Sequence, residues 1–590
     1  MINSKYSKTF SIFLLCELGL SVLFTVFSLS FKADISLLAF PLNAVFTGFF
    51  IWYGFCKVYH QKKQKYSNYA LKFIQYVPTV FLITFIIQRA GKAGKPYWLD
   101  VICAVLWIFV FVLSCVLQYY MSDKREKKLQ DFWLEKCEKK KKPKGLGRLV
   151  YEIVDWIDAL LQVVFLVFIF QIFTFQLYVI PSESMVPEFL VKDRVIVEKI
   201  GSGPKFPLSD AGLKEFSNYK RGDIVVIRNP HYTMDHQSEV KSVASQLVYM
   251  LTFMAVNLNK DENGEMKADP LVKRVVGVQG EQLVMQDGVL YTRTKDSDVF
   301  KPIPESEDFA CWNLNSTNKK INEKIQTFPL SQEEYDMMLS FEEERRNYDL
   351  DAAEFRVKEI IRTMKSLVKE EKTGPFTEPN LFLHTLLSSD YELSIKIMTQ
   401  EGGLEWLSEF LSSWIPQKNQ IRDLYSESNF RLNVMAKVTF GNLILKNAQM
   451  IKANVSSINW NTDKELVSYK ELASKILWYV QGNEYNSIAV PGHLDMRNMP
   501  VFPANDKDGN AQYIPENCFF MMGDNRFNSL DLRHSYDPIK KPLCEKDPHS
   551  IYYVSYMEPQ YLHQKYIIGK PMYTFFPLNR AGSIKNKKRI

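Results

Sequence analysis

The sequence predicts a multi-span α-helical membrane anchor followed by a mainly-β domain, with a mostly helical subdomain inserted into that domain. Five apolar runs lie within the first 180 residues, short β-branched runs begin after Pro181, and apolar residues recur at helical spacing between about 300 and 512. A chain of 590 residues also exceeds one ordinary domain. We expect units at residues 1–156, 157–180, 181–300, 301–512 and 513–590.

The apolar runs are the first element to justify. The candidate spans are residues 10–31, 35–56, 70–88, 99–120 and 157–180. Each approaches the roughly 20 residues that a helix needs to cross the hydrocarbon core of a bilayer. Glu17 lies in the first run, whereas no charged residue lies between Ala159 and Ile180. The first run lacks a small-residue cleavage site and is followed at once by the second, so it is expected to be a span and not a cleaved signal peptide.

Basic residues next to the runs predict the orientation. Four lysines follow the second run, and a dense basic stretch lies between Lys124 and Arg148. Both loops should stay in the cytoplasm, which places everything after Ile180 outside. The smaller loop with Arg89 opposes this assignment and is outweighed. Because the net charge of +7 gathers beside the spans, the sequence predicts a membrane protein and no nucleic-acid partner.

The domain after Pro181 is predicted to be rich in strands. Residues 194–199, 223–228 and 272–278 are dominated by β-branched side chains. Residues 283–291 predict a hairpin with a type I′ turn at Asp287-Gly288.

Two stretches interrupt this β pattern. Residues 244–258 are apolar but too short to cross a bilayer; a buried helix is favoured, and an element at the membrane interface is the alternative. Helical spacing recurs in 332–371, 381–411 and 465–479, where no repeat or catalytic signature is apparent. No role for the 301–512 region follows from its sequence.

Cysteine and histidine spacing points to no metal site. The eight cysteines lack CxxC spacing, and a disulfide among Cys311, Cys518 and Cys544 is less favoured than free thiols. His231 and His236 are more typical of a solvated loop than of a metal site. No nucleotide-binding loop or cofactor motif is apparent, so no cofactor is predicted.

A serine hydroxyl needs an adjacent base to act as a nucleophile near neutral pH. The chain has no GxSxG motif, and none of its eight histidines lies in a recognisable hydrolase context, although a triad assembled from distant residues stays open. A lysine buried among apolar groups is another base. Strand alternation should direct either Lys273 or Arg274 inward; taken alone, a purely structural lysine is favoured.

Five motifs together resemble one family. Residues 181–187 (PSESMVP) resemble the PSxSMxP nucleophile box of bacterial type I signal peptidases, and residues 273–277 (KRVVG) with Gly280-Glu281 resemble the family's lysine box. Residues 523–533 (GDNRFNSLDLR) are similar to its GDNRxxSxDSR box. Residues 221–225 (RGDIV) and 567–582 resemble two further elements, in the family's order. The resemblance covers about 157–300 and 513–582, without the first four spans or the helical insertion.

The resemblance implies a role for each matching residue. Ser184 would be the nucleophile and Lys273 the general base, with the Ser184 N–H and the Ser182 hydroxyl forming the oxyanion hole. Ser529 would hydrogen-bond the lysine amine. The expected supporting ion-pair residues are Asp531, Arg533 and Arg274, and the expected substrate-binding residues are Tyr178, Ile180, Pro181, Leu271 and Val272. Purely structural roles remain open for Ser182, Asp531 and Arg533.

The implied protein is a membrane-bound serine endopeptidase that removes N-terminal signal peptides from secretory preproteins after small residues at −3 and −1. It would lie in the bacterial cytoplasmic (inner) membrane as a multi-pass protein, with its catalytic domain on the outer (periplasmic) face. Its partners would be preproteins, the lipid bilayer and the translocation machinery. Four extended residues after Ile180 reach at most ~14 Å, which predicts that Ser184 lies close to the outer membrane face.

Three positions depart from the family pattern: Glu188, Lys192 and Leu532 replace its usual threonine, glycine and second serine, which bears on fine specificity. Residues 539–560 also look inserted. The alternatives are a self-cleaving repressor-type serine/lysine peptidase, a non-catalytic scaffold whose helical insertion binds a partner, and the microsomal branch, which has histidine where Lys273 stands.

Overall fold

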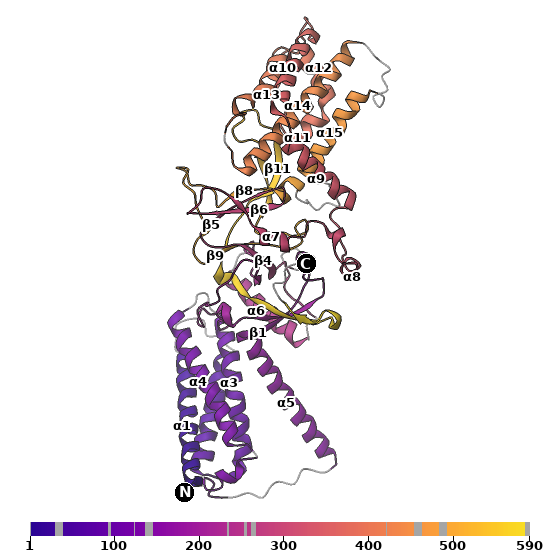
Figure 1. Ribbon diagram of the computed structural model, residues 1–590. Helices are drawn as coiled ribbons and strands as arrows, with labels where there is room; N and C mark the ends of the chain where they lie inside the picture. Colours follow the sequence, from indigo (N-terminus) through magenta and orange to yellow (C-terminus); the bar gives the residue numbers. More distant parts are fainter. Residues whose placement is uncertain are drawn as a thin grey trace.

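A computed structural model describes residues 2–29, 39–91, 96–122, 124–135, 145–232, 235–252, 256–260, 267–420, 422–453, 463–482 and 492–584. Apolar helices lie at one end, the β-sheets in the middle and a helical region at the opposite end (Figure 1). The sheets therefore lie between two helical bodies.

The N-terminal helices are α1 (Ile2–Leu29), α2 (Ala39–Ile51), α3 (Ser67–Ala90), α4 (Tyr97–Tyr120) and α5 (Leu146–Phe173). Four helical segments in the described residues are long and apolar enough to cross a membrane: Lys5–Ser28, Gln64–Ala90, Tyr97–Met121 and Leu146–Phe173. Residues 35–38 of the predicted span 35–56 lie outside the described residues. Its described part is α2, which has 13 residues, followed by a π-helix at Trp52–His60, and it is not among these segments.

The bundle of α1 to α4 has an aromatic core with paired polar groups. The rings of Phe24 and Phe81 stack at 4.4 Å. The Ser114 hydroxyl donates to Glu17 Oε1 at 2.6 Å, so the acidic residue of the first span has a partner on α4. In contrast, α5 has no buried residue, although its C-terminal aromatic side chains pack against this core.

The predicted fifth span, 157–180, ends too late. Helix α5 ends at Phe173, and Phe175–Val179 form strand β1. The sequence did not reveal this boundary because no charged residue separates the strand from the helix. The chain from Phe173 to Ser184 can therefore extend up to about 40 Å. The short distance between the span and Ser184, which predicted that Ser184 lies close to the membrane face, is thus lost.

The largest sheet is antiparallel throughout, with strand order β1-β2-β13-β3-β4-β9-β12 and β14 paired to β13. Its strands are β1, β2 (Arg194–Glu198), β3 (Ile224–Ile227), β4 (Leu271–Gly277), β9 (Cys518–Met522), β12 (Leu562–His563), β13 (Ile567–Phe576) and β14 (Gly582–Ser583). The three strands predicted from β-branched runs are all present, as β2, β3 and β4.

A four-stranded sheet has the order β7-β6-β5-β8 and contains β5 (Glu281–Gln286), β6 (Val289–Thr294), β7 (Lys301–Pro302) and β8 (Met499–Phe502). Asp287 and Gly288 join β5 to β6 with φ of 51° and 81°, as the predicted type I′ turn requires. Strand β8 lies inside the predicted 301–512 helical region, so the β region resumes earlier than expected. The strands β10 (His534–Pro542) and β11 (Tyr552–Met557) form a separate ribbon.

Helices fill most of the chain between β7 and β8. They are α7 (Pro304–Phe309), α8 (Lys319–Asn322), α9 (Gln332–Arg346), α10 (Leu350–Leu367), α11 (Leu383–Ser388), α12 (Asp390–Thr399), α13 (Gly403–Ser412), α14 (Leu424–Lys452), α15 (Lys464–Gln481) and α16 (His493–Arg497). The helical patterns at 332–371, 381–411 and 465–479 are confirmed. Helix α14 is buried along most of its length and forms the centre of this region.

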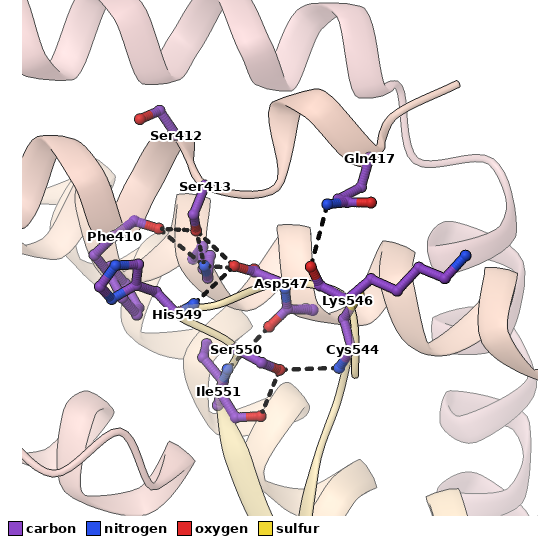
Figure 2. Close-up of polar contacts among 12 residues, drawn as sticks. Phe410, Ser412, Ser413, Gln417, Cys544, Lys546, Asp547, His549, Ser550 and Ile551 are labelled. Carbon is purple, nitrogen blue, oxygen red and sulfur yellow. Dashed lines mark hydrogen bonds and ion pairs between the residues drawn. The ribbon is translucent and has the colours of Figure 1, made fainter. Parts of the chain in front are cut away.

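The ribbon β10–β11 packs onto the helical region. Figure 2 shows Asp547 and other residues of its connecting loop beside Phe410 and Ser413, at the end of helix α13. There the Lys437 amine lies 2.6 Å from Asp547 Oδ2, and both side chains are fully buried. A second link is Asp287 of the β5–β6 turn, which pairs with Arg345 of α9. The residues 539–560 that looked inserted thus belong to the same packed body as the helices.

Helix α6 (His236–Leu251) corrects another prediction. Among the residues of 244–258 whose burial is described, only Ser245 is buried, and Val256 and Leu258 are 42% and 54% exposed. The favoured buried helix is therefore wrong, because the described elements leave most of this segment uncovered. Cys311, Cys518 and Cys544 form no disulfide among the described residues, as the favoured interpretation of their spacing expected.

Candidate active site

The loop between β1 and β2 carries Ser184. Two groups of Asn525 hold this loop: its backbone N–H donates to the Ser184 carbonyl at 3.1 Å, and its side-chain amide donates to the Glu183 carbonyl at 3.1 Å. Asn525 belongs to the GDNR motif, so two sequence motifs far apart in the chain meet here. Ser184 itself stays partly exposed.

Lys273 lies opposite, in the middle of β4. Its Nζ donates to Ser184 Oγ at 3.1 Å, and its side chain is 1% exposed. Burial lowers the pKa of Lys273 to about 8, with nearby Asp531 acting in the opposite direction. A substantial fraction of the amine is therefore neutral near pH 8, as a general base must be.

The neighbouring Arg274 is buried as well, 2% exposed, although alternation suggested that only one of the two would face inward. The sheet is covered on both faces, so both directions from β4 lead into protein. Arg274 forms a bidentate pair with Asp524 at 2.7 and 2.6 Å and donates to the Gly222 carbonyl at 2.7 Å. Its ion pair is thus separate from the one that Asp531 makes.

Asp531 pairs with Arg533 as expected, with a closest distance of 2.9 Å and both side chains fully buried. Burial acts to raise the pKa of Asp531, but the charge and hydrogen bonds of Arg533 outweigh it and hold that pKa below its usual range. Asp531 is therefore a permanent anion beside the lysine. Arg533 also donates to the carbonyls of Met496 and Arg526, which ties the motif to the end of the helical region.

Ser529 lies at the site, but its contact differs from the expected one. Its hydroxyl donates to Asp531 Oδ2 at 2.9 Å, whereas the Lys273 amine donates to Ser184 and not to Ser529. Gly523 explains how closely the loops pack: a Cβ added there would lie 2.2 Å from Ser529 Oγ and 2.5 Å from the Ser184 carbonyl oxygen. Only glycine fits at this position.

The expected oxyanion groups are near the nucleophile. Ser182 Oγ lies 3.4 Å from Ser184 Oγ on the exposed side of the loop. Within the described residues the Ser184 N–H donates no hydrogen bond. The Ser184 N–H is therefore available to a substrate oxygen, whereas the Ser182 hydroxyl donates to Ser184 Oγ and would have to turn away from it to reach a substrate.

The residues expected to bind substrate lie on both faces of the large sheet. Tyr178, Ile180 and Val272 pack into one apolar cluster that also contains Met185, next to the nucleophile. Leu271 packs against the cluster on the opposite face of the sheet, and Pro181 is exposed. Strand β1 pairs only with β2 in the described residues, so its other edge can accept a strand.

Sequence reasoning missed the groups that hold the nucleophile loop from behind. The buried carboxylate of Glu183 accepts the backbone N–H groups of Gln326 and Thr327 at 2.5 and 3.1 Å. Cys311 exchanges backbone hydrogen bonds with the GDNR segment at 2.8 and 3.0 Å. Arg580 donates to Asp193 and to the Glu188 carbonyl, at 2.8 and 2.9 Å. Only contacts between distant segments reveal these roles.

The structure shows how two residues that depart from the family pattern, Lys192 and Leu532, are accommodated. Lys192, where the family has glycine, adopts φ of 72°, a left-handed conformation that costs a non-glycine residue energy. Leu532, in place of serine, is 2% exposed and packs in the core of the large sheet. His231 stacks on Tyr536 and His236 lies 3.0 Å from the Ala90 carbonyl, so these histidines do not share a site.

A second serine–lysine pair, Ser413 and Lys437, differs from Ser184 and Lys273 because a carboxylate contacts both of its members. Lys437 Nζ lies 2.8 Å from Ser413 Oγ, but the same amine contacts Asp547 at 2.6 Å, and Ser413 also donates to Asp547 at 2.6 Å (Figure 2). The carboxylate engages both groups. Among the described residues the Lys273 amine has no such direct carboxylate partner, so its surroundings differ from those of Lys437.

The comparisons with known proteins concern the part of the chain that carries Ser184 and Lys273. The family model for signal peptidase, peptidase S26, matches residues 153–340. Signal peptidase I of Buchnera aphidicola (from Schizaphis graminum) is 28% identical over 136 residues, which are 23% of this chain and 41% of that protein. Signal peptidase I P of Bacillus subtilis subsp. natto is 27% identical over 143 residues, 24% of this chain and 52% of that protein. Signal peptidase I of Pseudomonas aeruginosa is 28% identical over 139 residues, 23% and 46% of the two chains.

The matched stretches thus span about half or less of these relatives. The family match contains Ser184 and Lys273 and ends before Ser529 and Asp531. Residues 153–340 of this chain are therefore similar to the peptidase S26 family of signal peptidases.

Proposed function

We propose that this protein is a membrane-bound serine endopeptidase in which Ser184 and Lys273 form the catalytic dyad. One observation carries the proposal: a buried lysine amine lies 3.1 Å from the hydroxyl of a partly exposed serine, and no carboxylate of the described residues is in direct contact with that amine. Such an amine can be neutral at working pH and can activate an alcohol.

In this mechanism neutral Lys273 takes the proton of Ser184 Oγ while that oxygen forms a bond to the scissile carbonyl carbon. The Ser184 N–H and the Ser182 hydroxyl hold the resulting oxyanion; removal of one such donor costs about 2.7–4 kcal/mol in barrier height. The protonated amine then gives its proton to the leaving amine as the C–N bond breaks. Water, deprotonated by the same lysine, releases the acyl group from Ser184.

The proposed substrates are secretory preproteins, cut after small residues at −3 and −1. The name signal peptidase I, which the similar proteins carry, supports this class. The tight apolar cluster of Tyr178, Ile180, Met185 and Val272 beside the nucleophile supports small side chains next to the cut. We also propose that the substrate pairs as a strand with the free edge of β1.

The proposed location is the bacterial cytoplasmic membrane, with several spans, a cytoplasmic N-terminus and the catalytic domain on the periplasmic face. The basic residues that follow the second and fourth apolar runs in the sequence support this orientation, because loops rich in lysine and arginine stay in the cytoplasm. The bilayer and the translocation machinery are the proposed neighbours; the helical region at the far end of the molecule is the surface available to a partner.

The test compares Ser184→Ala and Lys273→Ala with the matched controls Ser468→Ala and Lys475→Ala, which change exposed residues of the helical region. Each protein is inserted in vesicles and supplied with a preprotein. Both site variants should lose cleavage, and both controls should keep it. A β-lactam-type acylating inhibitor should add its mass to the parent protein and not to Ser184→Ala.

Normal cleavage by either site variant would refute the dyad. Failure of the parent protein to cleave or to be acylated would favour the non-catalytic scaffold.

A further inference from the structure

A loop of the β domain enters the end of the membrane bundle. Residues 203–212, which we call the docking loop, follow β2 and lie against α3, α4 and α5. The ring of Phe206 is 5% exposed, and its centroid lies 5.8 Å from that of Phe85, 5.5 Å from that of Trp107 and 5.0 Å from that of Phe173. Each of these three aromatic residues belongs to a different helix, so one side chain joins the β domain to three helices.

A polar contact lies beside this aromatic one. The Ser209 hydroxyl donates to Asp100 Oδ2 at 2.7 Å. Asp100, on α4, is fully buried and pairs with Arg89 at the end of α3. Leaving this carboxylate without its partners would be costly, because the group is shielded from water. The docking loop therefore completes a polar site that α3 and α4 begin.

Hydrogen bonds within the docking loop hold it in one conformation. The N–H of Phe206 donates to the Ala211 carbonyl at 2.8 Å, and the N–H of Ala211 donates to Ser209 Oγ at 3.1 Å. A separate contact supports the same interface: the His236 ring lies 3.0 Å from the Ala90 carbonyl at the end of α3. The contact between β domain and bundle is thus built from two segments of the domain.

Helix α5 alone would hold the β domain poorly. None of its residues is buried, and it leads directly into β1 through Thr174. A domain attached only there could pivot about the end of α5. The docking loop adds contacts with α3 and α4 and removes that freedom.

We propose that the additional spans position the active site over the membrane, with Phe206 and Ser209 as the positioning residues, and that this favours substrates which are themselves tethered to the bilayer. The inference rests on the proposed peptidase function. A tethered cleavage site is confined to one height and orientation, so a fixed enzyme meets it at high effective concentration. A soluble peptide can approach a pivoting domain from any side and gains nothing from the contact.

The test uses the full chain in phospholipid vesicles and two substrates: a preprotein with its apolar signal segment, and a soluble peptide that spans the cleavage site without that segment. Phe206→Ala and the double variant Phe206→Ala/Ser209→Ala are compared with Phe216→Ala, a control that changes a 65% exposed phenylalanine just after the loop. We expect kcat/KM for the preprotein to fall about tenfold or more, and kcat/KM for the peptide to stay within about twofold. The control should change neither value.

Hydrogen exchange of residues 203–212 provides a readout that needs no catalysis. Exchange should be slow in the parent protein and fast in the docking-loop variants. Equal losses on both substrates would overturn the proposal, because the loop would then support the active site itself; unchanged preprotein cleavage with fast exchange would also overturn it. If the parent protein cleaves neither substrate, the peptidase function fails, and slow exchange in the parent still shows the docking.

Discussion

The dependence of the reaction on pH should follow the ionisation of one buried amine. Burial lowers the pKa of Lys273 to about 8, and only the neutral amine can accept the proton of Ser184. At that pKa about one molecule in eleven is active at pH 7 and half are active at pH 8. The rate should therefore rise about tenfold from pH 7 to a plateau above pH 9.

The assay is kcat/KM for a soluble peptide substrate between pH 6 and pH 10, in parallel with the rate at which an acylating inhibitor labels Ser184. Both profiles should show the same limb, because both require the same deprotonation. A rate that stays constant from pH 7 to pH 9, or a rate that rises only above pH 10, would refute the role of a buried, deprotonated lysine. In the second case the base would have the pKa of an ordinary solvated amine.

The same pKa predicts a change in stability. The pKa is lowered from 10.5, so between about pH 8 and 10.5 the unfolded chain binds more protons at this site than the folded chain does. Stability should thus rise with pH across that window, and below it the buried amine costs up to about 3 kcal/mol. Lys273→Met should abolish cleavage yet unfold at higher denaturant concentration at pH 7, whereas the exposed control Lys475→Met should change neither property.

Three further substitutions test the packing of the site. Gly523→Ala should lower kcat about 100-fold in the peptide assay, because its Cβ would displace the Ser184 carbonyl and the Ser529 hydroxyl; near-normal kcat would contradict the close approach of these two loops. Glu183→Ala removes the acceptor of two backbone N–H groups and should cost about 2–3 kcal/mol in unfolding free energy and slow the acylation of Ser184, whereas unchanged acylation would separate this anchor from the nucleophile. Lys192→Gly relieves a left-handed conformation and should raise unfolding free energy by up to about 1 kcal/mol without altering kcat; a loss of stability would show that the lysine side chain is needed.

The sequence predicted the parts of the site that depend on local pattern. Ser184 and Lys273, whose side chains meet at 3.1 Å, could be singled out because each lies in a short motif. The hairpin turn was predicted because Asp287-Gly288 has the conformational preference that a type I′ turn requires. Contacts between distant segments were not accessible in this way. Nothing near Glu183 in the sequence indicates that its carboxylate binds the backbone at Gln326.

Helix α14 is the largest element that the sequence patterns did not predict, and its burial explains why. Helix α14 is buried on nearly all sides, so it lacks the apolar stripe by which a surface helix is recognised. Its polar residues Asn433 and Lys437 face inward and are satisfied by Asp547, more than a hundred positions away in the sequence. The end of α5 was misplaced for a different reason: no charged residue separates the helix, which ends at Phe173, from the strand that follows it.

The paired charges at both ends of the helical region limit how the protein can be shortened. Excising helices α9 to α15, while keeping the segment with Cys311, Gln326 and Thr327 that holds the Ser184 loop, would strip Asp547 and Asp287 of their cationic partners, Lys437 and Arg345. It would also expose the apolar residues of the β10–β11 ribbon. Removing one member of such a buried pair typically costs about 3–5 kcal/mol. A minimal enzyme would have to lose the ribbon together with the helices and carry a neutral residue at position 287.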